Sequence, residues 1–461
     1  MIVLTVIAAA VFMANLDLWI VNVAFVAIGT SLSASLADVS WVLNAYAVTL
    51  AALLVPAGRL GDRVGHRKVF LGGVVVFTLA SAACGLAPNL AVLVVARIAQ
   101  AAGAAAQLPA SLALLMAAVP AESRTNAARS WSAIGAVAAV CGPVIGGLLV
   151  TLDWRWVFVV NLPIGIAALA VGLRVLPHPA PRSREPIPDL AGAALLVAAV
   201  ASLTGALVEA PGWGWTSGRT IGLLAAGVVG SALFLWRSMR HAHPLVELHL
   251  LRVRRFAIAN AGTVAFSAAF AIMLLSNSLW CQAVWHYSPL RTGLAMAPGP
   301  LMVPFVTAWS ARLVLRVGLG PLTAVGSALF ALGLVWRIAA ATATPDYLRD
   351  LLPSMLIGGA GVGLALSSFI AAGATALPTE RSATASGTVN SGRQIASALG
   401  VAVLITILGA AGGTVARYDA GWWVGVGLSV VAGAIGLGLG RGGPRTVSPR
   451  SPREALAAAR D

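Results

Sequence analysis

Long apolar runs, each about the length of a bilayer crossing, alternate along the chain with short polar segments that contain nearly all of the charge. An α-helix needs roughly 20 apolar residues to cross the hydrocarbon core, and in lipid only helices and closed barrels satisfy their backbone hydrogen bonds. The pattern predicts fourteen membrane-spanning helices. Their expected ranges are 2–28, 39–57, 69–87, 90–118, 127–151, 156–176, 189–208, 219–236, 256–281, 292–313, 318–341, 347–373, 383–411 and 420–440.

The composition explains why these runs belong in lipid. Of the 461 residues, 59% are hydrophobic and 10% are charged, whereas a soluble domain carries roughly 25% charged residues. We therefore expect an all-α integral membrane protein whose partner is the lipid bilayer. The net charge of +15 does not indicate nucleic acid, because the basic residues stand in short loops beside apolar runs.

The basic residues also predict the orientation of the helices. If successive helices cross in alternating directions, the main basic clusters fall on one side, which the positive-inside rule makes cytoplasmic. Both termini would then be cytoplasmic in a multi-pass protein of the inner membrane, and 441–461 would form a disordered tail. The clusters are Arg59, Arg63, Arg67 and Lys68; Arg174, Arg182 and Arg184; and Arg237, Arg240, Arg252, Arg254 and Arg255. Expected interfacial anchors are Trp154, Trp156, Trp213, Trp215, Trp422 and Trp423.

Two short segments occur twice along the chain. The segment GRLGDRVG begins at Gly58 and reappears as ARLVLRVG at Ala311, and the Pro-Ala-Glu at Pro120 reappears as Pro-Thr-Glu at Pro378. Two echoes in the same order indicate two homologous halves. We expect six-helix bundles at 1–180 and 251–440, with a helix pair inserted at 181–250 and the substrate site between the halves.

Asp17 is the one acidic residue that the pattern places well inside a helix. An ionised carboxylate there costs about 2.5 to 3.5 kcal/mol, and such residues mark proton relays. Arg97 lies about 10 Å inside its own helix, at 1.5 Å per residue, within reach of Asp17 if the two helices adjoin. Both residues are candidates for proton coupling, and the alternative for each is a permanent structural polar contact.

Two further clusters point to helix movement. In the first, glycines allow a tight turn between helices, while Asp62 can accept hydrogen bonds from arginines; the alternative is a simple topology signal. This cluster comprises Gly58, Gly61, Asp62, Arg63, Gly65 and Arg67. In the second, within the helix 127–151, small residues allow close helix contact and a proline bends the helix; the alternative is ordinary packing. It comprises Gly135, Gly142, Pro143, Gly146 and Gly147.

These motifs resemble those of the major facilitator superfamily, and within it the fourteen-helix drug:proton antiporters. The segment from Gly58 is similar to the superfamily signature between helices 2 and 3, and the small residues of helix 5 are similar to its antiporter motif. The segment 16–24, LDLWIVNVA, resembles the family's helix-1 signature. Arg97 and Gln100 resemble a helix-4 motif implicated in proton transfer, although Ala101 replaces a usual glycine. The resemblance implies a conformational latch, export and proton exchange.

The resemblance also suggests a substrate cavity. Asn390, Arg393 and Gln394 are similar to a polar cluster of this family, with a structural role as the alternative. We expect them to line the cavity together with Trp19, Asn22, Asn44, Tyr46 and Gln100. Asn44 stands where several multidrug members have an acid, and Trp19 and Tyr46 offer aromatic surface, so we expect a neutral or monocationic lipophile.

The most consistent function is a proton-coupled antiporter that exports small lipophilic drugs or antibiotics. The alternative is a dedicated exporter or facilitator of one endogenous metabolite. An enzyme is disfavoured because the sequence offers no intramembrane cluster of histidines, cysteines and acids. The three cysteines stand apart at spacings unlike metal sites, and no phosphate-binding loop suggests ATP. We expect no cofactor, no metal and a monomer.

Overall fold

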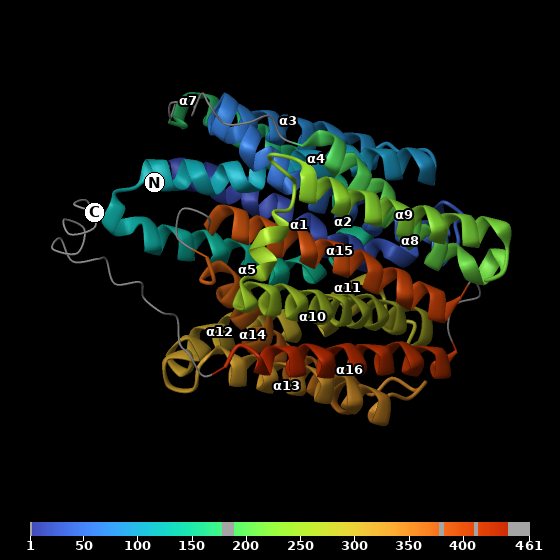
Figure 1. Cartoon of the computed structure of the whole chain (residues 1–461). Helices are drawn as coiled ribbons and strands as arrows, with labels where there is room; N and C mark the ends of the chain where they lie inside the picture. Colours follow the sequence, from blue (N-terminus) through green and yellow to red (C-terminus); the bar gives the residue numbers. More distant parts are fainter. Residues whose placement is uncertain (1, 178–188, 378–381, 410–413, 441–461) are drawn as a thin grey trace.

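The structure, a computed structural model, describes residues 2–177, 189–377, 382–409 and 414–440, and every regular element within them is a helix. The helices form one bundle, with the first residues of α1 and the last of α16 at the same end (Figure 1). The predicted tail 441–461 lies outside the described residues. The elements are α1 (Ile2–Ser31), α2 (Leu36–Val64), α3 (His66–Gly85), α4 (Leu90–Ala118), η1 (Ala121–Ser123), α5 (Arg124–Val150), α6 (Trp156–Val159), α7 (Asn161–Val175), α8 (Leu190–Trp213), α9 (Gly218–Arg240), η2 (Leu248–Arg252), α10 (Arg254–Leu279), η3 (Trp280–Val284), α11 (Pro289–Met296), α12 (Pro298–Val317), α13 (Leu319–Ala340), η4 (Tyr347–Leu351), α14 (Leu352–Ala374), α15 (Ser382–Leu408) and α16 (Val415–Leu437).

Thirteen helices within the described ranges are long and apolar enough to cross a membrane. The remaining predicted span, 292–313, is divided at Ala297 into α11 and α12. Pro298 and Pro300 lack the backbone N–H groups that would bond to the last carbonyls of α11, so the break has a local cause. Counted as one crossing, α11 and α12 complete the predicted fourteen.

The segment Gly58–Lys68, predicted to contain a turn between helices, is almost entirely helical. The helix α2 continues to Val64 and α3 begins at His66, so Gly65 alone connects them. Gly65 has a φ of 101°, a conformation that glycine adopts without strain. The connection is therefore tighter than the sequence predicts.

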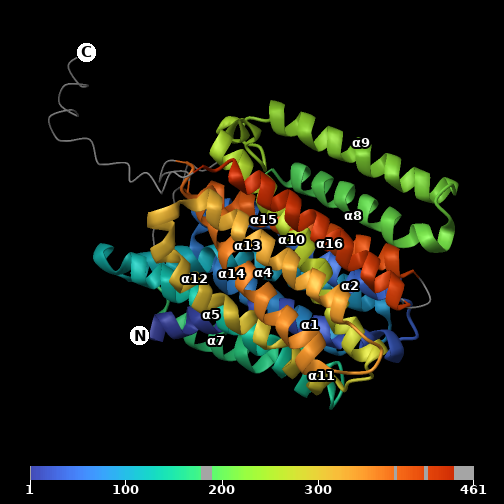
Figure 2. The same ribbon diagram turned by 90° about the horizontal axis from the view of Figure 1, so that it is seen from below.

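The elements fall into two groups with a pair of helices beside them. In Figure 1, α1 to α4 and α7 lie in the upper part and α10, α12 to α14 and α16 in the lower part. Figure 2 shows α8 and α9 at the edge of the bundle, where α8 packs against α2 and α15. The division into 1–180, 181–250 and 251–440 stays a prediction, with which this arrangement agrees.

Close helix contacts recur at matching places in the two groups. A Cβ on Gly103 of α4 would lie 2.8 Å from the carbonyl oxygen of Gly73 in α3. In the other group, a Cβ on Gly361 of α14 would lie 2.7 Å from the carbonyl oxygen of Gly326 in α13. Both helix pairs therefore depend on glycine for their backbones to approach.

These two contacts follow the repeat found in the sequence. The offset between the glycines of α3 and α13 equals the offset between the segments that begin at Gly58 and Ala311. The offset between the glycines of α4 and α14 equals that between Pro120 and Pro378. The same spacing thus relates both the sequence echoes and the helix contacts.

Four of the six tryptophans expected at the membrane interfaces are exposed. Trp154 and Trp422 are the exceptions, because their side chains are only 3% and 0% exposed. The indole Nε1 of Trp422 donates a hydrogen bond to Ser276 Oγ at 2.9 Å. The prediction that these two tryptophans are interfacial anchors is wrong, because both side chains pack in the core of the bundle. The exposed four are Trp156, Trp213, Trp215 and Trp423.

An ion pair joins α8 and α9 at one end. The Asp189 carboxylate accepts hydrogen bonds from Arg237 Nε at 3.0 Å and Nη2 at 2.7 Å, and from the backbone N–H of Gly192 at 2.8 Å. Burial by itself raises the pKa of Asp189, but these hydrogen bonds and the charge of Arg237 outweigh it and lower the pKa from its ordinary value.

Asp189 therefore contributes stability that depends on pH. Its folded-state pKa lies below that of an unfolded aspartate, about 3.9. The contribution is complete above that value and is lost as the pH falls through the folded-state pKa. Asp189→Asn should lower the thermal unfolding midpoint of the purified protein by a few degrees near pH 7, and by less near pH 3. Equal shifts at both pH values, measured by tryptophan fluorescence, would contradict this account.

Candidate functional site

Asp17 of α1 and Arg97 of α4 meet in the interior of the first helix group. Arg97 Nη1 donates a hydrogen bond to Asp17 Oδ2, and the two charged groups form an ion pair. Gln100, one turn further along α4, donates from Nε2 to Asp17 Oδ1 at 2.9 Å. The side chains of Asp17 and Arg97 are 0% and 1% exposed. The predicted contact between these two residues is present in the structure.

Other helices complete the surroundings of this pair. Arg97 Nε donates to the carbonyl oxygen of Val42 in α2 at 3.1 Å, and its guanidinium lies 4.1 Å from the ring centre of Tyr46. On the other side, Ser81 Oγ of α3 accepts a hydrogen bond from Gln100 Nε2 at 2.7 Å. Asn161 of α7 donates from Nδ2 to Asp17 Oδ1 at 3.4 Å. We call this set, Asp17, Ser81, Arg97, Gln100 and Asn161, the buried polar cluster.

Ser81 and Asn161 are the members that sequence reasoning missed. Each is a polar residue in a largely apolar helix, and both side chains are buried. Buried polar groups need hydrogen-bond partners, so a polar residue in an apolar helix indicates a polar contact. A single sequence does not indicate which helix provides the partner.

A cavity of about 530 Å³ lies between the two helix groups, bounded by α1, α2 and α5 on one side and by α10, α11, α12, α14 and α15 on the other. Six of the eight residues predicted for it line its wall. They are Trp19, Asn22, Asn44, Asn390, Arg393 and Gln394. Tyr46 and Gln100 do not line it, because their side chains belong to the surroundings of Arg97. Most of the remaining wall is apolar.

The small residues of α5 bring three helices together at one end of this cavity. A Cβ on Gly142 would collide with the Cβ of Trp19, and one on Gly146 would lie 2.8 Å from Cγ1 of Ile20, both in α1. A Cβ on Gly147 would lie 2.5 Å from the carbonyl oxygen of Pro289 in α11. In return, Gly293 of α11 packs against the carbonyl of Pro143. The motif therefore forms a contact between the two helix groups.

Gly135, the first residue of that motif, has ordinary surroundings. A Cβ there would lie 3.6 Å from Oδ1 of Asn15, and the residue lines the cavity. The end of the cavity at which α5 meets α11 is also closed between α1 and α10. There, Ser278 Oγ donates a hydrogen bond to the carbonyl oxygen of Asn22 at 2.9 Å. Direct backbone approach thus brings the two groups together at this end.

The charged cluster at the opposite end differs in detail from its prediction. Asp62 Oδ1 lies 3.1 Å from Nε2 of His66, and no arginine contacts Asp62 among the ion pairs of the described residues. A Cβ on Gly61 would lie 2.5 Å from Nδ1 of His66, so the glycine makes room for this ring. Gly58 has no close neighbour of that kind, and Arg63 is exposed. In this conformation the ion-pair partner of Asp62 is therefore His66 and not one of the predicted arginines.

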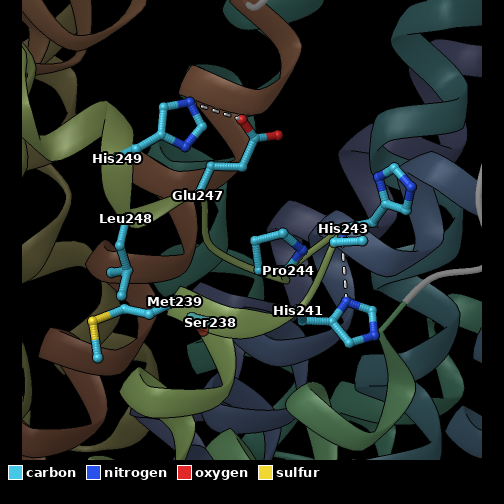
Figure 3. Close-up of a pocket in the computed structure, with 9 residues that line it drawn as sticks. Ser238, Met239, His241, His243, Pro244, Glu247, Leu248 and His249 are labelled. Carbon is cyan, nitrogen blue, oxygen red and sulfur yellow. Dashed lines mark hydrogen bonds and ion pairs between the residues drawn. The ribbon is translucent and has the colours of Figure 1, made fainter.

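Arg67 of this cluster and the neighbouring Arg59 contact other segments instead. Arg67 Nη2 donates to the carbonyl oxygen of Leu173 in α7. Arg59 donates from Nη1 to the carbonyl oxygen of His243 at 3.1 Å and lies 3.6 Å from Glu247. Figure 3 shows His243 and Glu247 around a cavity of about 360 Å³ in the connection between α9 and α10. The end of α2 is thereby tied to the segment that leads into the second helix group.

A second buried arginine was not predicted from the sequence. Arg337 of α13 is fully buried, and its guanidinium carbon lies about 5 Å from the ring centres of three tryptophans. These are Trp280, Trp285 and Trp422. Asp350, near the start of the predicted span 347–373, is also fully buried, and its element η4 continues directly into α14. Arg337 lies near the end of its helix, where an arginine is normally an interfacial residue.

The comparison with protein families decides the identity of this fold. Residues 7–401 match the family described as Major Facilitator Superfamily. The chain belongs to the major facilitator superfamily. It is therefore a multi-pass membrane transporter and not an enzyme.

Two curated relatives within this superfamily are resistance proteins. The chain is 38% identical over 403 residues to the Multidrug resistance protein Stp of Mycobacterium tuberculosis, covering 87% of this chain and 74% of that protein. It is 35% identical over 401 residues to the Tetracenomycin C resistance and export protein of Streptomyces glaucescens, covering 86% and 74%. Among solved structures, the peptide transporter POT in complex with sulfate aligns with a TM-score of 0.71 at 16% identity, covering 95% of this chain and 96% of that one. This last likeness concerns the major facilitator fold alone.

Proposed function

We propose that this major facilitator transporter exports small lipophilic drugs or antibiotics across the cytoplasmic membrane in exchange for protons. The relatives named for multidrug resistance and for tetracenomycin C export support the substrate class and the direction. The observation that carries proton exchange is the buried ion pair of Asp17 and Arg97 beside the central cavity. We further propose that both termini are cytoplasmic and that the protein acts as a monomer.

Asp17 is suited to carry the proton because it is a buried carboxylate, and its ion pair with Arg97 exists only while it is unprotonated. In the conformation described, Arg97 forms an ion pair with its carboxylate, and Gln100 donates a hydrogen bond to it. A proton on Asp17 would remove the ion pair and leave Arg97 with its bonds to Val42 and Gln100. Protonation should therefore favour a different arrangement of α1 and α4.

The substrate is coupled to this proton through α1. Trp19 and Asn22 line the cavity within the same helix that carries Asp17 into the buried polar cluster. A compound that binds the cavity in this conformation stabilises the arrangement in which Asp17 is charged. Substrate binding and loss of the proton then favour the same state, which is the condition for exchange.

Everted membrane vesicles test this function. A vesicle with an acidic interior should accumulate tetracenomycin C, or another compound from a panel of dyes and antibiotics, only when it contains the transporter. The accumulation should vanish when an ionophore collapses the pH gradient. Equal accumulation with and without the gradient would indicate a facilitator, and transport of a single compound would indicate a dedicated exporter.

We propose that Asp62 acts as a conformational latch through its contact with His66. An exposed pair of this kind contributes up to about 1 kcal/mol, so Asp62→Asn should slow transport several-fold without changing membrane insertion or substrate binding. His66→Gln should have a similar effect. Transport rates in vesicles that match the wild type for both variants would remove the latch from the mechanism.

A further inference from the structure

The central cavity has one charged residue in its described wall, and that residue is a cation. Arg393 lines the cavity from α15, whereas no aspartate or glutamate is among the described residues of its wall. Asn44, at the position where an acid would have favoured cations, is an amide. The electrostatic character of the wall is therefore positive.

The guanidinium of the partly buried Arg393 has an unpartnered nitrogen, Nε, beside the cavity. Arg97 pairs with Asp17, whereas the buried Arg337 has no hydrogen-bond partner in the described part of the chain and lies over tryptophan rings outside the cavity wall. Within the described residues, no ion pair involves Arg393, and its buried Nε has no hydrogen-bond partner. A partly buried charge without a counter-charge is costly, and a ligand anion would reduce that cost.

Several neighbours define the shape of a matching ligand. Asn390, Gln394 and Ser397 line the cavity beside Arg393, so the polar groups of α15 form one patch. Aromatic side chains from the opposite helix group and from α10 also face the cavity, at Trp19, Trp131 and Phe270. The wall therefore suits a compound with an apolar aromatic body and one polar end.

We propose that Arg393 makes the cavity selective for lipophilic compounds that carry a single anionic group, such as a carboxylate. The planar guanidinium presents paired N–H donors that match a carboxylate in a bidentate arrangement. The inference rests on the proposed function, since it assumes that this cavity holds the exported compound. It replaces the expectation of a monocationic substrate, because Arg393 repels cations and no wall acid offsets it.

Three probes with a common ring test the proposal on the purified full-length transporter. The probes are 2-naphthoate, 2-naphthamide and a naphthyl trimethylammonium salt, and their binding is measured by isothermal titration calorimetry. The wild type should bind the naphthoate most tightly. Arg393→Gln should weaken naphthoate binding roughly tenfold or more, as expected for a lost hydrogen bond to a charged group, and change amide binding less than about twofold. Arg393→Lys should recover part of the loss, because the charge returns without the paired donors.

Arg240→Gln serves as a matched control, since Arg240 is exposed at the end of α9. It should leave the binding of all three probes unchanged. The proposal is overturned if the wild type does not prefer the naphthoate, or if Arg393→Gln weakens amide and naphthoate binding equally. If vesicles accumulate neutral compounds in a proton-dependent way but naphthoate is not preferred, this inference fails and the proposed function stands. If naphthoate selectivity depends on Arg393 but no proton-driven accumulation occurs, the proposed function fails instead.

Discussion

Asp17→Asn is expected to reduce substrate accumulation in vesicles with an acidic interior to the level measured without a pH gradient. The asparagine side chain is nearly isosteric, and its oxygen still accepts a hydrogen bond from Arg97 or Gln100. It has no proton to exchange, so the gradient no longer drives the cycle. Exchange of labelled for unlabelled substrate should continue, because that process needs only the cavity and the helix movement.

Asp153→Asn is the matched control for this variant. Asp153 lies in the connection between α5 and α6, and its side chain is 46% exposed. It should accumulate substrate as the wild type does. Retained exchange in Asp17→Asn also shows that the protein is folded, which matters because Arg97 loses its counter-charge. Accumulation by Asp17→Asn at the wild-type level would assign the proton to another residue.

Gly147→Val is expected to prevent the two helix groups from meeting at the α5–α11 end. The new Cβ would lie 2.5 Å from the carbonyl oxygen of Pro289 and 2.7 Å from the Cα of Leu290. These are backbone atoms that cannot rotate away, and overpacking of this kind costs about 1 to 3 kcal/mol. A cost of that size shifts a conformational equilibrium by roughly 5- to 150-fold. The transport rate should fall by a similar factor, and the conformation in which α5 and α11 are separated should become the more populated one.

Spin labels at Leu152 and Leu294, both exposed near this contact, measure the shift. The distance between them should lengthen in Gly147→Val relative to the wild type. Gly72→Val is the control, because a Cβ at Gly72 meets nothing within 4 Å, and it should leave the distances unchanged. A wild-type distance distribution in Gly147→Val would show that the contact can absorb the extra side chain.

Much of the fold can be predicted from the sequence, because the length of each apolar run sets the length of a helix and the spacing of residues within a run sets their depth in that helix. The depth of Arg97 in its helix placed it within reach of Asp17 if the two helices adjoin, and the pair is present. Asn390, Arg393 and Gln394 likewise line the cavity as expected. The position of Arg97 followed from helix geometry, whereas the cavity residues were expected from the resemblance to a polar cluster of the family.

What the sequence does not predict depends on contacts between distant helices. Ser81 and Asn161 join the buried polar cluster only because α3 packs against α4 and α7 packs against α1. The partner of Asp62 is His66 because α2 continues to Val64 and turns through one residue, which places His66 one helical turn from the carboxylate. Arg337 is enclosed by tryptophans from two other elements. Such partners follow from packing, and the apolar pattern does not encode them.

The claim that Asp17 exchanges a proton for substrate is tested most directly by proton release. Purified transporter in weakly buffered solution is mixed with a compound that vesicles accumulate, and the change in pH is followed with an indicator dye. The wild type should release protons as the compound binds, because binding favours the conformation in which the Asp17 carboxylate and Arg97 form their ion pair. Asp17→Asn should bind the same compound and release none. Equal proton release by both proteins would contradict the account.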